Sequence, residues 1–336
     1  MESFWNKLPR PFFAMAPMAD VTDPAWRSLA AKLGKPDITW TEFVSADGLY
    51  HTRERNVGHP MSYIPDAGNP LMRDLQFSEA ERPIVAQFFT AKPEMMAYAT
   101  KLAYKLGFDG VDINMGCPDR TIEHQGAGAC LIKTPELAAE LIRAAQEASP
   151  LPVSVKTRIG YNTEELDEWL PALLAAKPAA ITLHLRTRKE MSLVPARWEL
   201  MERAVAMRNR LAPEVLLLGN GDIKDLEDAR AKVAETGCDG AMIGRGMFGN
   251  PWLFSRSEYS PEQGRGSRSI GEKLHTLVEL AQRFEALTPP KHFAILKKHI
   301  KAFVTGFDGA AELRARLMEA ENAVYLKRII DDAERF

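Results

Sequence analysis

The amino-acid sequence predicts an α/β fold, a (β/α)8 TIM barrel, followed by a small all-α C-terminal domain. Short apolar runs alternate with amphipathic stretches, and the runs are continuously apolar, as is typical of parallel strands covered by helices. This rhythm extends from about Pro11 to Asn250, close to the ~250 residues of such a barrel. After Trp252 the pattern becomes helical.

The elements follow one another in strand–helix order. Eight strands are expected, at 11–18, 38–43, 83–89, 109–114, 152–158, 179–184, 214–220 and 239–244. Helices are expected at 24–34, 93–106, 135–148, 163–176, 197–210 and 224–236. The alternative, a doubly wound sheet, is disfavoured because no G-x-G-x-x-G follows the first strand.

Two stretches fall outside this rhythm. Segment 44–82, which carries His51, Arg53 and Arg55, is too long for an ordinary βα loop, so we expect it either to fold over the barrel mouth or to decorate the barrel. Residues 255–269 are polar and rich in Gly and Ser, which is typical of a linker. We therefore expect a barrel domain at 1–254, a linker at 255–269 and a helical domain at 270–336.

Composition limits the possible classes of protein. Of the 336 residues, 46% are hydrophobic and 26% are charged, and the net charge is -2. A sizeable core is therefore possible, and any basic surface must be local. We see neither an apolar run of the ~20 residues that a membrane helix needs nor a signal peptide. The cysteines, Cys117, Cys130 and Cys238, form no C-x-x-C, so we expect a cytoplasmic protein without zinc.

Polar candidates gather where the expected strands end, and the active site of a (β/α)8 barrel lies at the C-terminal ends of its strands. In chain order these candidates are Met18, Gln87, Asn114, Cys117, Lys156, Arg158, His184, Arg186, Asn220, Gly221, Asp222, Gly244 and Arg245. Their common placement is a stronger signal than any one of them.

The motifs GNGD (219–222) and IGRG (243–246) follow the last two strands. Phosphate commonly binds between these loops, where glycine lets backbone N–H groups approach. Arg245 would add a charge partner. The alternative is that the glycines only make tight turns.

Lys156 at a strand end would place an ammonium group inside the mouth, where it must meet an anion or negative dipoles. The anionic pyrimidine edge of a reduced flavin is one partner. A Schiff base in a lyase and a simple solvent-exposed lysine are the alternatives. Gln87 and Asn114 can donate and accept, as an isoalloxazine edge requires, or they cap strands.

Cys117 lies in a Gly-Cys-Pro turn within the glycine-rich stretch 113–131. We expect this stretch to be shaped to approach a ligand, with Cys117 at its tip. A thiol with a free pKa of about 8.5 can donate a proton at neutral pH. Cys130 and Cys238 are instead expected to be small buried hydrophobic residues.

Together these motifs resemble a known family. APMADVTDPAWR, VAQFF, INMGCPDR, GAGACL, VKTRIG, HLRTR, GNGDI and IGRGMFGNPW occur in this order between residues 11 and 254. The set resembles the tRNA-dihydrouridine synthases, flavoenzymes that reduce specific uridines in RNA. The tail, with LKKHIKAFVTGF and LRARL, is similar to the RNA-binding domain of that family.

The resemblance implies FMN in the barrel mouth, NADPH as reductant and tRNA as partner. A monomer is expected for an enzyme that clasps a large RNA. Cys117 would donate a proton to one carbon of the uracil double bond, while reduced FMN gives a hydride to the other. The implied flavin contacts are Ala16, Pro17, Met18, Gln87, Asn114, Lys156 and His184, with Asn220, Gly221, Asp222, Gly244 and Arg245 at the phosphate. The implied RNA contacts are Arg158, Arg186, Arg188, Lys297, Lys298 and Lys301.

Other functions stay open at this point. An FMN oxidoreductase for a free pyrimidine, similar to dihydroorotate dehydrogenase, would need no basic helical tail; the same reaction on ribosomal RNA is a closer variant. A flavin-free lyase would use Lys156. An RNA-binding protein with an idle barrel is disfavoured by the intact set of Cys117, Lys156 and GNGD. The tail holds 11 Lys and Arg against 10 Asp and Glu from residue 271 onward, so it also fits an ordinary amphipathic helix with a solvated basic face.

Overall fold

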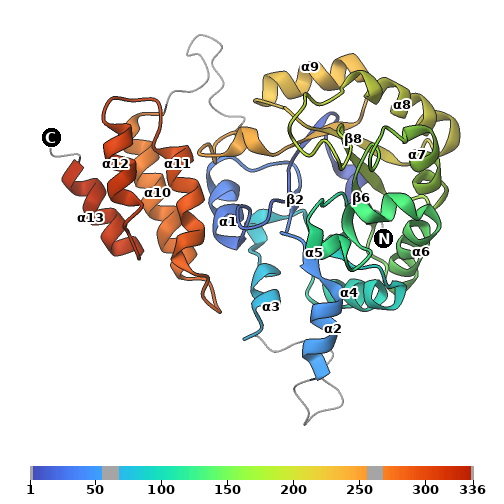
Figure 1. Cartoon of the computed structure of the whole chain (residues 1–336), viewed down its shortest axis with the longest axis horizontal. Coiled ribbons are helices and arrows are strands. Elements are labelled where there is room, and N and C mark those ends of the chain that lie inside the picture. Colours follow the sequence, from blue (N-terminus) through green and yellow to red (C-terminus); the bar gives the residue numbers. More distant parts are fainter. Residues whose placement is uncertain (1–2, 55–67, 256–267, 334–336) are drawn as a thin grey trace.

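The computed structural model describes residues 3–54, 68–255 and 268–333. It confirms the predicted fold, a parallel barrel wrapped by helices and followed by a group of helices (Figure 1). The strands are β1 Phe12–Met15, β2 Thr39–Trp40, β3 Val44–Ser45, β4 Ile84–Phe89, β5 Gly110–Met115, β6 Val153–Arg158, β7 Ala180–His184, β8 Leu216–Asn220 and β9 Gly240–Ile243. They pair in the order β1-β9-β8-β7-β6-β5-β4-β2, and a parallel bridge between Ala14 and Ile38 closes the circle.

The second strand is broken, which the sequence did not predict. Trp40 of β2 pairs with Val85, and Val44 of β3 pairs with Phe88. One more residue therefore stands on this strand than on β4 between the two pairs, which is the geometry of a bulge. The break places Glu42 in a buried position, where its Oε1 accepts a hydrogen bond from Val21 N at 3.1 Å.

The barrel helices follow the strands as predicted, with starts up to three residues later. They are α1 Pro24–Leu33, α4 Pro93–Lys105, α6 Pro135–Ala148, α7 Leu166–Ala175, α8 Glu199–Leu211 and α9 Leu226–Thr236. Shorter helices are η1 Phe4–Lys7, η2 Glu79–Glu81, α5 Arg120–Glu123, η3 Gly128–Lys133 and η4 Arg245–Met247. Proline begins α1, α4 and α6, in the first helical turn, where backbone N–H groups have no intrahelical partner.

Segment 44–82 contains regular elements. It holds β3, α2 Ala46–Glu54, α3 Pro70–Asp74 and η2. Helix α2 packs against α4, with the rings of Tyr50 and Tyr98 edge to face at 5.3 Å. Of the two alternatives, decoration of the barrel is therefore the better description of the described part. Arg55 and the side chain of Arg53 lie outside the described residues.

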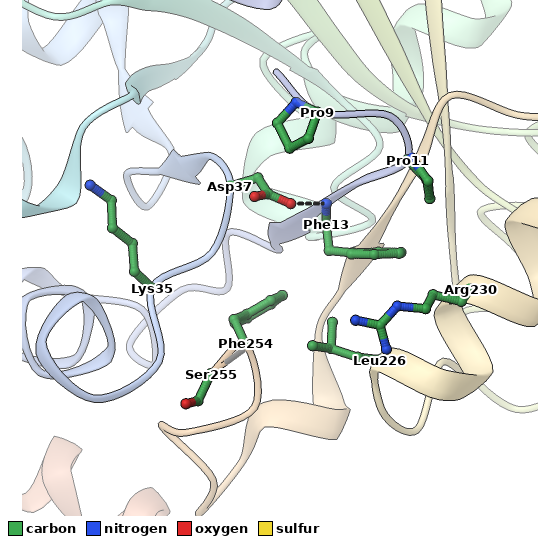
Figure 2. A pocket seen from close by; sticks show the side chains of 9 residues that line it. All are labelled: Pro9, Pro11, Phe13, Lys35, Asp37, Leu226, Arg230, Phe254 and Ser255. Atoms are coloured by element: carbon green, nitrogen blue, oxygen red, sulfur yellow. Dashed lines mark hydrogen bonds between the residues drawn. The ribbon is translucent and has the colours of Figure 1, made fainter. Parts of the chain in front are cut away.

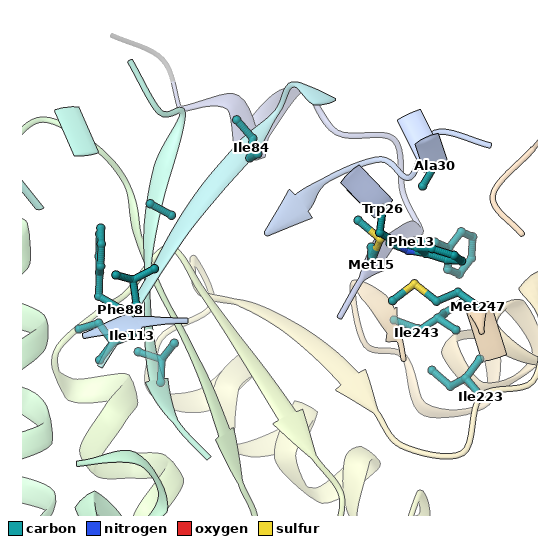
Figure 3. Packing of buried hydrophobic residues seen from close by; sticks show 14 of the residues in the cluster. Phe13, Met15, Trp26, Ala30, Ile84, Phe88, Ile113, Ile223, Ile243 and Met247 are labelled. Carbon is teal, nitrogen blue, oxygen red and sulfur yellow. The ribbon is translucent and has the colours of Figure 1, made fainter. Parts of the chain in front are cut away.

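The two larger apolar clusters hold the barrel together. One fills its interior, where Phe12, Trp40 and Val85 meet. Trp5 of η1 lies at the N-terminal end of this core, with its ring 5.9 Å from Phe12 and 6.1 Å from Trp40, and closes the barrel floor. The other core lies between strands and helices; Figure 3 shows members such as Phe13 and Trp26.

The C-terminal helices are α10 Ile270–Glu285, η6 Phe293–Leu296, α11 Lys297–Phe303, α12 Ala310–Leu317 and α13 Ala323–Ala333. Most of the predicted linker lies outside the described residues. Helix α10 packs against α1, where Lys32 and Glu279 form an ion pair at 2.8 Å. His299 of α11 stacks on Trp26 of α1 at 4.6 Å between ring centroids. These contacts fix the helical part beside the loop that follows β1.

Candidate active site

A cavity of about 290 Å³ lies at the C-terminal ends of the barrel strands. It brings together most of the site residues predicted from the sequence: Ala16, Pro17, Met18, Asn114, Cys117, Lys156, Arg158, His184, Arg186, Asn220, Gly221, Asp222, Gly244 and Arg245. Phe43 and Ser192 also line it and were missed. Phe43 ends the second predicted strand, so the rule applied to the other strands would have found it, whereas no motif marks Ser192.

The glycine-rich stretch braces the cysteine loop. Asn114 Oδ1 accepts hydrogen bonds from Gly116 N at 3.1 Å and Cys117 N at 2.9 Å. Ala129 N donates to Cys117 O at 2.9 Å. Gly128 has a φ of +64°, and a Cβ there would lie 2.7 Å from Cys117 O. Gly128 is thus required by its close approach to the backbone of Cys117, while Gly116, Cys117 and Pro118 of the same stretch line the cavity.

The Cys117 thiol stays protonated at neutral pH. Burial raises its pKa, and the charge of Asp119 raises it further, against the opposing charges of Arg158 and Lys156. Cys238 is buried as predicted, but Cys130 is only half-buried. The prediction of a buried Cys130 was wrong because η3, on which it lies, turns that side chain toward the surface.

A chain of hydrogen bonds runs from the cavity wall into the barrel. Asn114 Nδ2 donates to Gln87 Oε1 at 3.1 Å, and Gln87 Nε2 donates to Asp112 Oδ2 at 2.7 Å. Ser154 Oγ donates to Asp112 Oδ1 at 2.6 Å. Gln87 is therefore fully buried behind Asn114 and does not itself line the cavity. Sequence reasoning missed Asp112, although it precedes Asn114 by two residues and so shares its inward face.

Lys156 lies at the bottom of the cavity, where its Nζ donates to the neutral Asn220 Oδ1 at 3.3 Å. The carboxylate that lines the cavity, Asp222, pairs instead with Arg186 and Arg245. Burial lowers the pKa of Lys156 to about 8, and the charge of Arg158 acts in the same direction. An anion bound above it would raise that pKa again and stabilise the charged form.

His184 is a neutral imidazole. Burial lowers its pKa well below the ordinary value, and the charges of Lys156 and Arg158 add to that effect. Arg186 Nη1 lies 3.2 Å from His184 Nε2. Because a guanidinium can only donate, Nε2 must accept, which leaves Nδ1–H as the imidazole donor.

The loops after β8 and β9 are joined by one carboxylate. Asp222 contacts both Arg186 and Arg245, and it also accepts from Ala196 N at 2.8 Å. Gly221 has a φ of +124°, and a Cβ there would lie 2.8 Å from Ala196 Cβ. This glycine is therefore required by the turn. Asp222 would repel a phosphate and is better placed to orient Arg245, whose side chain is 59% exposed.

The cations predicted to bind RNA lie in different settings. Arg158 Nε donates to Gly116 O at 2.8 Å, and Arg188 Nε donates to Glu123 Oε1 at 2.7 Å. In the C-terminal helices, Lys297 donates to a backbone carbonyl, Lys298 pairs with Asp20 at 3.1 Å and Lys301 is exposed. Asp20 belongs to the loop after β1, so α11 lies close to the barrel mouth.

A second cavity, of about 340 Å³, lies outside the barrel wall (Figure 2). Phe13, whose amide donates to Asp37 Oδ2 at 2.8 Å, faces it from β1, and Arg230 faces it from α9. None of the residues predicted for the site lines it. Although this cavity is the larger, the chemistry lies in the cavity at the strand ends.

Comparison with known proteins identifies the family. The model of the dihydrouridine synthase (Dus) family matches residues 14–335. The chain belongs to the dihydrouridine synthase family. This membership confirms the enzyme class predicted from the sequence, a flavin-dependent oxidoreductase.

Individual relatives agree over nearly the whole chain. A "Probable tRNA-dihydrouridine synthase 2" from Bacillus subtilis (strain 168) is 39% identical, covering 99% of this chain and 97% of the relative. A "Probable tRNA-dihydrouridine synthase" from Staphylococcus aureus (strain COL) is 38% identical, covering 99% and 96%.

Solved structures share the barrel. Morphinone reductase matches with a TM-score of 0.50 and 14% identity, over 73% of this chain and 84% of that one. A 2-naphthoyl-CoA reductase complex matches with a TM-score of 0.52 and 10% identity, over 72% and 49%. At such identities the likeness concerns the fold alone. Among the described residues, no helix is long and apolar enough to cross a membrane.

Proposed function

We propose that this protein reduces uridines in tRNA to 5,6-dihydrouridine, with FMN in the strand-end cavity and NADPH as the reductant. The observation that carries the proposal is the position of the Cys117 thiol on the wall of a cavity rich in cations, where burial raises the pKa of the thiol. The relatives named above are tRNA-dihydrouridine synthases by name, which favours tRNA over ribosomal RNA as the substrate.

The cavity fits an anionic flavin nucleotide. Its lining includes four cationic side chains, Lys156, Arg158, Arg186 and Arg245, and one carboxylate, Asp222. Lys156 would face the ring edge, because its Nζ donates to the neutral Asn220 Oδ1, whereas the Arg158 guanidinium is already held by three backbone carbonyls. Arg245 would face the phosphate, because it is exposed and held by Asp222 at 2.5 Å. FMN, once reduced by NADPH, supplies the hydride for one carbon of the uracil double bond.

The remaining residues would hold the Cys117 loop and orient the flavin. Cys117 Sγ keeps its proton until the base has entered, because burial disfavours the thiolate. Asn114 fixes the Cys117 loop through its Oδ1 and is itself held by Gln87. We therefore assign Gln87 to support of Asn114. His184 Nδ1–H would donate to the ribityl chain, and Ala16, Pro17 and Met18 would line the flavin on the β1 side.

RNA would approach over the mouth and the neighbouring α11. Lys298 and Lys301 are exposed there, and Lys297 lies on the same short helix. Arg158 lines the cavity, so we assign it to the extruded uridine. Arg188 pairs with Glu123 outside the cavity lining, so we assign it to the RNA outside the cavity. Arg186 contacts His184 and Asp222, so we assign it to support of these two residues.

An anaerobic flavin titration tests this function. The purified protein is reduced with NADPH, unmodified tRNA is added, and reoxidation is followed by absorbance. Reoxidation by tRNA, but not by free uridine or orotate, is the expected result. Reoxidation by orotate alone would instead establish an enzyme for a free pyrimidine, and a protein that takes up no FMN would overturn the flavin assignment.

The same assay tests the role of Cys117. Cys117→Ala should bind FMN and accept electrons from NADPH normally, but it should lose roughly 10²- to 10⁴-fold of the rate with tRNA, the usual contribution of a positioned acid. Cys130→Ala is the matched control, since this half-buried thiol does not line the cavity. Full activity of Cys117→Ala would refute the assignment.

A further inference from the structure

Three neighbouring apolar side chains are exposed to solvent at the rim of the active-site cavity. Leu193 is 85% exposed, Met191 42% and Val194 38%. Large apolar side chains gathered in this way on a soluble protein usually mark a surface that meets a partner. We refer to residues 191–194, on the loop between β7 and α8, as the apolar tip.

The apolar tip is held rigidly by two arginines of the site. Arg158 Nη1 donates to Thr187 O at 3.1 Å and to Met191 O at 3.0 Å. Arg186 Nε donates to Val194 O at 2.6 Å. Both guanidinium groups are buried, so the carbonyls at the two ends of the tip are fixed to the cavity wall.

The backbone within the tip is also constrained. Met191 N donates to Arg188 O at 3.2 Å, and Leu193 N donates to Glu190 O at 2.9 Å. Met191 adopts a φ of +55°, in the left-handed region that residues other than glycine seldom occupy. A conformation of this kind persists only where the surroundings enforce it. The exposure of these side chains is thus built into the loop.

The position of the tip indicates what it meets. Ser192, between Met191 and Leu193, lines the cavity, as do both anchoring arginines. The tip therefore borders the cavity that part of a large substrate would enter. A nucleotide reaching a buried site has to leave its base stack, and apolar side chains are the groups that proteins insert between bases.

We propose that the apolar tip inserts into the RNA base stack beside the extruded uridine and occupies the space that this base leaves. The inference rests on the proposed function and specifies how the substrate is opened. A few side chains on a narrow loop match a single base step, whereas a stable protein interface needs about 800 Å² from each partner. Phosphate contacts would call for Lys or Arg at these positions instead.

The test compares two RNA substrates with FMN-loaded protein. One is folded tRNA, and the other is a short single-stranded RNA that contains the same uridine already unstacked. For Leu193→Ser we expect kcat/KM to fall about tenfold on folded tRNA, which corresponds to about 1.4 kcal/mol, and to stay within about twofold on the single strand. Leu193→Met should retain wild-type rates on both.

A second readout reports extrusion directly. With 2-aminopurine placed next to the target uridine, binding of wild-type protein should raise its fluorescence because the neighbouring base unstacks. Leu193→Ser should lose most of that rise. Val324→Ser is the matched control: Val324 is 79% exposed on α13, away from the cavity, and its replacement should change neither readout.

Three results would overturn the proposal. They are an equal loss for Leu193→Ser on both RNAs, wild-type behaviour on both, and a change in sedimentation that shows the tip to be a contact between copies of the chain. Failure of the wild-type protein to reduce either RNA would count against the proposed function instead. In that case fluorescence anisotropy still tests the tip, since Leu193→Ser should weaken binding of folded tRNA relative to the single strand.

Discussion

At the scale of single residues, the carboxyl group beneath the cavity gives a pH signature. Burial raises the pKa of Asp112 to about 6, above its ordinary value of 3.8. The folded protein therefore keeps this proton at a pH where the unfolded chain releases it. The stabilisation from this group is complete below pH 3.8 and is lost as the pH rises through 6, by about 3 kcal/mol.

Asp112→Asn should abolish the loss of stability that accompanies ionisation of Asp112. Urea unfolding at several pH values between about 4 and 7 is the measurement. The free energy of unfolding of the wild type should fall relative to that of the variant as the pH rises across this range. Two curves that stay parallel would show that Asp112 titrates normally.

The Cys117 thiol sets the upper limit of the pH range in which RNA can be reduced. Because burial raises its pKa, the proton donor is present throughout the neutral range and disappears only when the thiol ionises. The single-turnover rate of RNA reduction should therefore hold through the neutral range and decline only in alkaline solution. Decay of that rate around pH 7 would mean that another group supplies the proton.

At the scale of elements, His299 joins α11 to α1. Burial lowers its pKa to about 4, from 6.5, so the unfolded chain binds a proton first. The stabilisation that this contact provides is complete above 6.5 and is lost as the pH falls to about 4, by about 3 kcal/mol. His299→Phe, which can still stack on Trp26, should flatten that part of the pH–stability curve. An unchanged acid limb, followed by circular dichroism, would contradict this.

Sequence patterns predicted the elements that depend on local signals. Continuous apolar runs such as PIVAQFF gave β4, because a strand buried on both faces must be apolar throughout. The bulge between β2 and β3 could not be predicted, since it exists only in the register against β4. For the same reason Asn114 was found and the burial of Gln87 behind it was not: the sequence identifies a strand end, but not which neighbouring side chain lies in front.

At the scale of the whole molecule, a buried ion cluster joins the barrel to the helices. Lys291, whose side chain is 4% exposed, contacts Glu42 at 2.8 Å and Asp74 at 3.2 Å. Burial raises the pKa of Glu42 although Lys291 opposes it, whereas the carboxylates outweigh burial and raise the pKa of Lys291. Loss of Lys291 would therefore leave the carboxylates of Glu42 and Asp74 without this counter-charge. Sequence alone did not reveal this docking, because it joins residues about 250 positions apart.

Lys291→Met should therefore destabilise the protein by about 3–5 kcal/mol, the usual cost of leaving a buried carboxylate without its partner. Thermal unfolding measures this. Lys298→Met is the control, since its pair with Asp20 is exposed and should contribute at most about 1 kcal/mol. Adding Glu42→Gln to Lys291→Met should recover part of the loss; no recovery would mean that Lys291 acts through packing alone.

The closed barrel floor has a kinetic consequence. Trp5 seals the N-terminal end beneath Phe12 and Trp40, so in the described part of the chain the cavity is reached from the strand ends. NADPH and RNA would then have to approach the same flavin from the same side, so they would bind alternately. Initial rates at varied concentrations of both should give parallel double-reciprocal lines. Each substrate should also inhibit at excess, because it binds the oxidation state of the enzyme with which the other substrate reacts. Intersecting lines would mean that the mouth admits both at once.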